Sequence, residues 1–190
     1  EGTFTGYFEI VLEGSFTKSS EYNVPLYAVP KDIIFAIDTS GSMRVKKLDQ
    51  AKAALEFCVD QLNPEDRFDI IRYSTETETL FNKLRTAKEQ QTKEAKEFVK
   101  ELKAGGGTAI EEALVLAIET ISKQENEKSI RPRQIIFITD GRPTIGETRT
   151  HKIIDRLVKK RQKIEGNMRI FSFGIGTDIN TKLLDLISQE

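Results

Sequence analysis

The sequence predicts an α/β fold, with a doubly wound, mostly parallel sheet and helices on both of its faces. Short runs of β-branched and aromatic residues recur along the chain, for example at residues 33–37 and 135–138. Each run is followed by a segment in which apolar residues return every three or four positions. Runs that are apolar throughout are typical of parallel strands buried on both faces. Their alternation with helices implies right-handed crossovers into one sheet.

The composition agrees with one globular domain and excludes several classes of function. The chain has 190 residues, of which 38% are hydrophobic and 31% charged, a balance that favours a folded chain over a disordered one. Its 29 basic and 30 acidic residues nearly cancel, so no electrostatic footprint for nucleic acid is expected. No apolar run is long enough for a membrane span. One cysteine and one histidine exclude an internal disulfide, a zinc–cysteine cluster and a multi-histidine metal site.

Residues 1–30 differ from the rest of the chain. They are rich in aromatic residues, serine and threonine, and residues 7–12 alternate in the manner of a strand. We expect a strand or hairpin that leads into the main domain at residues 31–190 and is too short to be a domain itself. The chain begins with Glu1 rather than Met, so we expect a fragment or a processed product.

The main domain contains four clear strand candidates and one weaker candidate. The weaker one lies around residues 77–84, where the pattern is shorter and more polar. The clear candidates are residues 33–37, 68–71, 135–138 and 170–173.

Five amphipathic helices are expected between and after these strands. The apolar stripe of the first includes Cys58, which we interpret as a small buried hydrophobic residue. The fifth begins near Asn180 and is expected to run to the end of the chain. The helical patterns cover residues 48–62, 92–102, 109–122, 153–158 and 180–190.

The first strand is followed by a loop rich in oxygen-bearing side chains. Asp38, Ser40 and Ser42 occupy positions i, i+2 and i+4, and Gly41 allows a tight turn between them. Ligands of open α/β sheets lie beyond the carboxyl ends of the strands. The spacing therefore permits these three side chains to point into one cavity at that edge of the sheet.

Two later segments supply further oxygen donors at equivalent places. Asp140 follows the strand candidate at residues 135–138, and Thr108 follows three glycines just before a predicted helix. Glycines there would let the backbone approach a site closely. Each segment also has a simpler interpretation, because Thr108 with Glu111 matches a capping box and the other two loops match ordinary turns. The combination of all three, in order, favours a metal site.

Oxygen donors without histidine or cysteine suit a hard cation, with Mg²⁺ preferred and Mn²⁺ or Ca²⁺ able to replace it. Asp38 and Asp140 only just balance a divalent charge. If some of these donors act through water, a bound ion stays electron-poor and would seek one more anionic oxygen, which an Asp or Glu of a partner protein would supply. This is a physical reason to expect metal-dependent recognition of acidic side chains.

At these residues the sequence resembles a von Willebrand factor type A domain over about residues 31–190. The metal-ion-dependent adhesion site (MIDAS) of that family combines Asp-x-Ser-x-Ser, a later Thr and a later Asp. Asp38, Ser40 and Ser42 match the first part, Thr108 the second and Asp140 the third. The resemblance implies a Rossmann-like fold and an adhesion or assembly module rather than an enzyme. It also implies that the hydroxyls contact the metal directly or nearly so, while both carboxylates often act through water.

A narrower resemblance, to inter-α-trypsin inhibitor heavy chains and their bacterial relatives, rests on residues 30–38, 106–108 and 139–148. It implies a larger protein that is secreted, attached to the cell surface or periplasmic. Such domains usually have a further strand and a final helix after the helix near Asn180. We therefore expect that strand and helix to be missing here, which would leave an exposed sheet edge. Thr39 and Met43 flank the ligands and are expected to shape the rim of the site.

Two other functions remain open on the sequence. A Mg²⁺-dependent phosphohydrolase could use Asp38 as its nucleophile, but the second Asp of that motif is Ser40 here. Such enzymes also need a lysine near the later aspartate, where the nearest basic residue along the chain is Arg142. A scaffold with a purely structural ion is the second alternative.

The remaining basic residues have ordinary explanations. His151, the single histidine, is predicted to be solvated at the start of a helix and offers no base for a serine hydrolase. The basic runs at residues 46–47 and 159–161 are interpreted as solvated helix faces, with contact to glycosaminoglycan or matrix as a weaker alternative.

Overall fold

The computed structural model describes residues 29–44, 46–123, 131–164, 168–177 and 179–189. The strand or hairpin predicted for residues 1–30 therefore lies almost entirely outside the described residues. The elements are β1 (Asp32–Asp38), a 3₁₀ turn η1 (Gly41–Met43), α1 (Lys46–Asp60), β2 (Arg67–Tyr73), β3 (Thr77–Thr79), β4 (Arg85–Thr86), α2 (Glu89–Glu101), α3 (Ile110–Ser122), β5 (Arg133–Thr139), α4 (Thr150–Arg161), β6 (Met168–Gly174) and α5 (Thr181–Ser188).

The six strands of the described residues form one sheet with the order β3-β2-β1-β5-β6, and β4 also pairs with β2. β1 is parallel to β2 and to β5, and β5 is parallel to β6. The short strands β3 and β4 are antiparallel to β2. From β1 the chain builds outward through β2, and it later returns to the other side of β1 with β5. The winding therefore reverses between β1 and β5, which confirms the predicted doubly wound, mostly parallel sheet.

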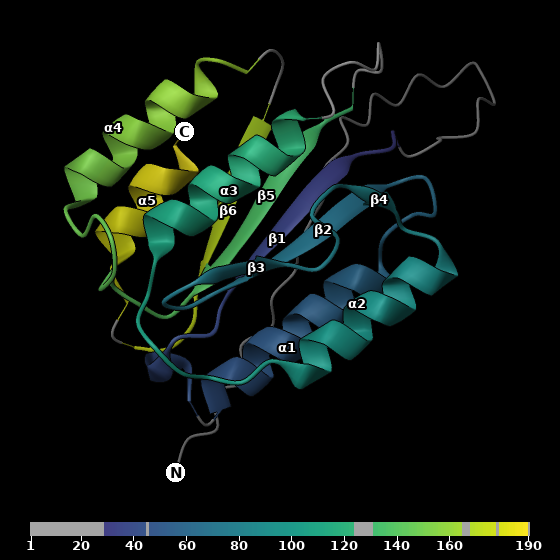
Figure 1. The fold of residues 1–190 in the computed structure, drawn as a ribbon, viewed down its shortest axis with the longest axis horizontal. Coiled ribbons are helices and arrows are strands. Elements are labelled where there is room, and N and C mark those ends of the chain that lie inside the picture. The colour runs from purple at the N-terminus through teal and green to yellow at the C-terminus, as the bar shows by residue number, and fades with distance from the viewer. Residues whose placement is uncertain (1–28, 45, 124–130, 165–167, 178, 190) are drawn as a thin grey trace, which may run out of the picture.

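Helices cover both faces of the sheet: α1 and α2 on one, and α3, α4 and α5 on the other (Figure 1). Successive side chains of a strand point to opposite faces. In β1, Ile34 and Ala36 pack with the α3 side, whereas Ile33, Phe35 and Ile37 pack with the α1 side. Both faces need apolar residues, which explains the continuous hydrophobic runs of the sequence.

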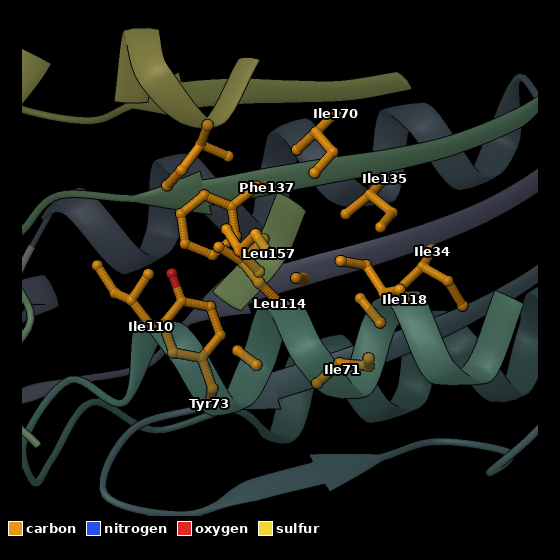
Figure 2. Packing of buried hydrophobic residues seen from close by; sticks show 14 of the residues in the cluster. Ile34, Ile71, Tyr73, Ile110, Leu114, Ile118, Ile135, Phe137, Leu157 and Ile170 are labelled. Atoms are coloured by element: carbon orange, nitrogen blue, oxygen red, sulfur yellow. The ribbon is translucent and has the colours of Figure 1, made fainter. Parts of the chain in front are cut away.

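The core beneath α3 includes an aromatic pair that joins β2 to β5 (Figure 2). The rings of Tyr73 and Phe137 stack with centroids 5.5 Å apart and planes 6° apart. The buried Tyr73 hydroxyl donates to the carbonyl of Ile138 at 3.3 Å, and α3 adds Leu114 and Ile118 to the same cluster. Tyr73 lies opposite Asp38 in the register of β1 and β2, so this packing supports the edge of the sheet where the predicted site lies.

Three local predictions need correction. The weak strand around residues 77–84 is only Thr77–Thr79, with a separate two-residue strand at Arg85–Thr86. The Phe81 amide donates to the Asp69 carboxylate at 2.9 Å instead of extending the ladder. Helix α5 ends at Ser188 rather than at the end of the chain. Cys58 is half-buried, not buried, although partial burial raises the pKa of its thiol.

No helix among the described residues is long and apolar enough to span a membrane.

Asp69 is a buried carboxylate in the middle of β2, fully shielded from solvent. Its Oδ1 accepts hydrogen bonds from the amides of Ile70 at 2.8 Å and Phe81 at 2.9 Å. Its Oδ2 is also buried but has no hydrogen-bond donor among the described groups. Burial raises the pKa of Asp69 to about 6, and the amides of Phe81 and Ile70 limit the rise. The fold therefore accommodates the protonated acid better than the charged form.

Asp69 should make the protein less stable as the pH rises from about 4 to 7. The native state holds this proton up to a pKa of about 6, whereas the unfolded chain loses it near 3.8. More protons are bound to the native state in that window, so the free energy of unfolding falls through it, by about 3 kcal/mol in total. Asp69→Asn removes the charge, and chemical denaturation at pH 4, 5.5 and 7 should show its advantage over the wild type growing with pH. A constant difference between the two proteins would contradict this.

Candidate metal centre

The first loop of the site begins where β1 ends. The carboxylate of Asp38 turns back on its own loop, and its Oδ1 accepts from the amide of Ser40 at 2.7 Å. The chain then enters the 3₁₀ turn η1, which places the hydroxyls of Ser40 and Ser42 3.0 Å apart. The spacing i, i+2, i+4 thus brings three oxygen side chains to one end of the strand.

The end of β5 closes against this loop from the neighbouring strand. The Ser42 hydroxyl donates to Oδ1 of Asp140 at 2.7 Å. The hydroxyl of Thr139, the last residue of β5, donates to Oδ2 of Asp38 at 2.6 Å. Four of the five predicted site residues, namely Asp38, Ser40, Ser42 and Asp140, are therefore joined by direct hydrogen bonds at the point where the sheet winding reverses.

The loop before α3 carries the fifth residue, Thr108. Two backbone hydrogen bonds tie this loop to the first: Gly41 N to Gly106 O at 3.0 Å and Gly105 N to Thr39 O at 2.8 Å. Gly106 has φ of +79°, and a Cβ there would lie 2.6 Å from the Thr75 hydroxyl oxygen, so the position needs glycine.

Thr108 itself is buried and its amide donates to the Thr144 hydroxyl at 2.8 Å. The N-cap of α3 is Ala109, without a side-chain cap, so the capping box with Glu111, the simpler interpretation of this segment, does not form. Within the described residues, no hydrogen bond joins the Thr108 hydroxyl to the other four site residues. The structure brings its loop to the site but does not link its side chain to theirs.

The two carboxylates of the site are shielded from water, whereas Ser42 beside them is exposed. Asp38 is 0% exposed and Asp140 is 2% exposed. Burial raises the pKa of Asp38, opposed by the hydrogen bonds from Thr139 and Ser40 and reinforced by the nearby charge of Asp140. Two buried carboxylates beside hydroxyl oxygens form an environment that a cation stabilises. The donors present are all hard oxygens, so the residues fit a divalent ion such as Mg²⁺.

Only two carboxylates belong to this set. In the part of the chain that the structure describes, no group of three or more histidine, cysteine, aspartate or glutamate side chains is arranged to hold a metal. The candidate centre therefore depends on hydroxyls as well as acids.

Lys47 also belongs to this site, and the sequence analysis missed it. Its ammonium lies 2.5 Å from Oδ2 of Asp140, and its side chain is one-third exposed. The prediction that residues 46–47 are a solvated face is wrong for this residue. One signal was available, because a lysine in the first turn of a helix opposes the helix dipole. In the other basic run, Lys160 pairs with Glu119, and Arg161 donates to the Met168 carbonyl at 2.9 Å.

The flanking residues do not form the rim. Thr39 is buried, and its hydroxyl donates to the Tyr73 carbonyl at 3.0 Å. Met43 is fully buried in the apolar cluster under α1 and α2, because the 3₁₀ turn points it inward. His151 lies exposed at the start of α4, as predicted.

Comparison with known proteins identifies the family of this chain. The family model described as the von Willebrand factor type A domain matches residues 31–190. The chain belongs to this family. The chain is also 35% identical over 168 residues to inter-alpha-trypsin inhibitor heavy chain H4 from Bos taurus, covering 87% of this chain and 18% of that protein. The chain thus spans less than a fifth of the length of this relative.

Solved structures show the same fold. A von Willebrand factor type A protein from Catenulispora acidiphila superposes with a TM-score of 0.70 and 28% identity, covering 85% of this chain and 37% of that one. Proximal thread matrix protein 1 from the mussel byssus, solved with a zinc-occupied MIDAS motif, gives a TM-score of 0.66 and 21% identity, covering 84% and 41%. At 21% identity, the similarity to the mussel protein is one of fold alone.

Proposed function

We propose that this type A domain is a metal-dependent protein-binding module for adhesion or assembly. The observation that carries the proposal is the hydrogen-bonded set of oxygen side chains at the carboxyl ends of β1 and β5. Asp38, Ser40, Ser42, Thr108 and Asp140 would hold a divalent cation, Mg²⁺ first and Mn²⁺ or Ca²⁺ as substitutes. The zinc-occupied MIDAS of the mussel protein supports a divalent ion in this family.

The charged and the neutral residues of the site have different roles. Asp38 and Asp140 supply the negative charge, and both are buried, so they have little water with which to share it. The hydroxyls of Ser40, Ser42 and Thr108 are neutral donors that add oxygen atoms without further charge. Thr139 holds Asp38 in place through its 2.6 Å hydrogen bond.

A partner carboxylate would complete the site. Two carboxylates only just balance a divalent charge, and a carboxylate that acted through water would leave a bound ion less neutralised. When bound, the ion supplies an electron-poor coordination position, which favours one more anionic oxygen. An Asp or Glu side chain of a partner protein is a hard anionic ligand of this kind. The partner class therefore follows from the charge at the site.

The cellular location of the protein is inferred from its relatives. Similarity to inter-alpha-trypsin inhibitor heavy chains supports a secreted, cell-surface or periplasmic protein. Two of the basic side chains that could serve a matrix or glycosaminoglycan contact are paired within the domain, Lys47 with Asp140 and Lys160 with Glu119. The acidic partner is thus better supported than a polyanion.

One observation favours the alternative of a phosphohydrolase that uses Asp38 as its nucleophile, and one opposes it. Lys47 at Asp140 provides the lysine that a phosphohydrolase needs and that the sequence did not indicate. Asp38, however, is completely buried, and each of its oxygens already accepts a hydrogen bond, from Ser40 and from Thr139. A nucleophile must reach its substrate, so this geometry favours a binding role without catalysis.

The proposal is tested by adding a simple carboxylate to the domain loaded with Mn²⁺. Acetate should lower the water-proton relaxivity of bound Mn²⁺, because the acetate oxygen replaces a coordinated water. Acetamide, a neutral match in size, should leave the relaxivity unchanged. A structural ion closed off by protein ligands would respond to neither probe.

Failure of Mn²⁺ to bind, or equal responses to acetate and acetamide, would refute the proposed function. A generic aryl phosphate belongs in the same series, since turnover that disappears in Asp38→Asn would favour the phosphohydrolase.

A further inference from the structure

Lys47 is placed where a bound cation would be expected. Its ammonium is 2.5 Å from Oδ2 of Asp140, while the Ser42 hydroxyl occupies Oδ1 at 2.7 Å. Both oxygens of this buried carboxylate are therefore engaged by side chains of the same chain. The lysine comes from the start of α1, 93 positions away from Asp140 along the chain.

The loop between β6 and α5 packs over this lysine. A Cβ at Gly176, whose φ is +108°, would lie 2.9 Å from Cε of Lys47 and 3.2 Å from its Nζ. Any larger residue at position 176 would press against the lysine side chain. The ammonium thus lies between a buried carboxylate and a closely packed backbone, an environment unlike that of a freely solvated lysine.

The position is costly for a lysine on other grounds. A positive charge in the first turn of a helix faces the positive end of the helix dipole. Lys46, one position earlier, avoids this conflict by exposure to solvent. Lys47 instead gains its stabilisation from Asp140, an acid that has few other ways to balance its charge.

We propose that Lys47 is a built-in competitor for the divalent cation. In the ion-free domain its ammonium neutralises Asp140, and it must leave that carboxylate before the ion can bind there. Lys47 therefore lowers the affinity for the ion and keeps the ion-free domain stable. This inference rests on the proposed function, because it concerns the same metal centre.

The test compares Lys47→Met, Lys47→Arg and Lys46→Met with the wild type. Methionine keeps an unbranched side chain, one heavy atom shorter and without the charge, and arginine keeps the charge. Lys46→Met is the matched control, because Lys46 is the adjacent residue, is exposed, and carries the same charge. Mg²⁺ affinity is measured by titration calorimetry, and the thermal midpoint is measured in EDTA, all at one ionic strength.

Lys47→Met should bind Mg²⁺ at least tenfold more tightly than the wild type, and its midpoint in EDTA should fall by several degrees. Lys46→Met and Lys47→Arg should stay close to the wild type in both measurements. Unchanged or weaker Mg²⁺ binding by Lys47→Met would overturn the inference while leaving the proposed function intact. Absence of Mg²⁺ binding in both the wild type and Lys47→Met would overturn both.

A second measurement does without Lys47→Met, in case that variant is too unstable to study. In ¹⁵N-lysine-labelled protein, the ammonium signal of Lys47 should be protected from exchange in EDTA and should lose that protection on addition of Mg²⁺. Lys47→Arg assigns the signal. Mg²⁺ binding that leaves the signal protected would refute competition.

Discussion

Asp38→Asn and Asp140→Asn should each weaken Mg²⁺ binding by at least 100-fold. Each variant removes one of the two negative charges of the site but keeps the size of the side chain. A 100-fold loss corresponds to about 2.7 kcal/mol, which is modest for removing a whole charge from a buried site. Titration calorimetry with Mg²⁺ measures the effect directly.

Both variants are expected to fold. Asp38 is buried and its pKa is raised by burial, so the neutral amide is better tolerated there than the charge in the absence of a cation. Asp140→Asn leaves Lys47 without a carboxylate, but this side chain is one-third exposed and can turn to solvent. Circular dichroism and the thermal midpoint in EDTA check this point.

Asp69→Asn is the matched control for these two variants. Asp69 is also a buried aspartate of the sheet, but it lies in the middle of β2 and is held by the amides of Ile70 and Phe81. Its replacement should leave Mg²⁺ affinity unchanged. Retained binding in Asp38→Asn or Asp140→Asn, or an equal loss in Asp69→Asn, would show that the metal is held elsewhere.

The second large effect is expected at the opposite end of the sheet, where β1 and β2 begin. Asp32 and Arg67 form a buried bidentate ion pair, with Nε–Oδ1 and Nη2–Oδ2 distances of 2.8 Å each. Asp32→Asn should lower the free energy of unfolding by about 3 kcal/mol, because the buried Arg67 guanidinium loses the charge of its bidentate carboxylate. Urea denaturation at neutral pH measures the loss.

An exposed ion pair provides the comparison. Lys96 and Asp60 also lie 2.8 Å apart, but their side chains are 37% and 53% exposed. Water solvates both charges when the pair is broken, so Asp60→Asn should leave the urea midpoint unchanged. Equal losses in Asp32→Asn and Asp60→Asn would mean that burial does not determine the strength of these pairs.

Much of the fold could be read from local pattern. The run at residues 33–37 predicts a strand buried on both faces, and its side chains do divide between the two core clusters. The buried apolar positions of α3, such as Leu114 and Ile118, belong to one core cluster, as expected because a period of 3.6 residues permits one buried stripe. The ends of β3 and β4 were less predictable, because the pairing of these few polar residues depends on the neighbouring strand β2.

The positions of the oxygen-bearing residues at the strand ends could also be predicted from the sequence. Asp38 and Asp140 directly follow apolar runs, and parallel strands present their carboxyl ends at one edge. Linear spacing therefore determined which loops approach one another. It could not determine burial, which removes Thr39 and Met43 from the rim and raises the pKa of Asp38.

By itself, the sequence determined the alternation of elements, the sheet type and the candidate donors, because each depends on residues near one another along the chain. Only the tertiary structure decided the partners of the buried charges. Lys47 reaches Asp140 across 93 positions, and Thr139 reaches Asp38 across 101. Such pairs depend on how two loops dock once the sheet has formed, and no local sequence pattern predicts which distant residues will meet.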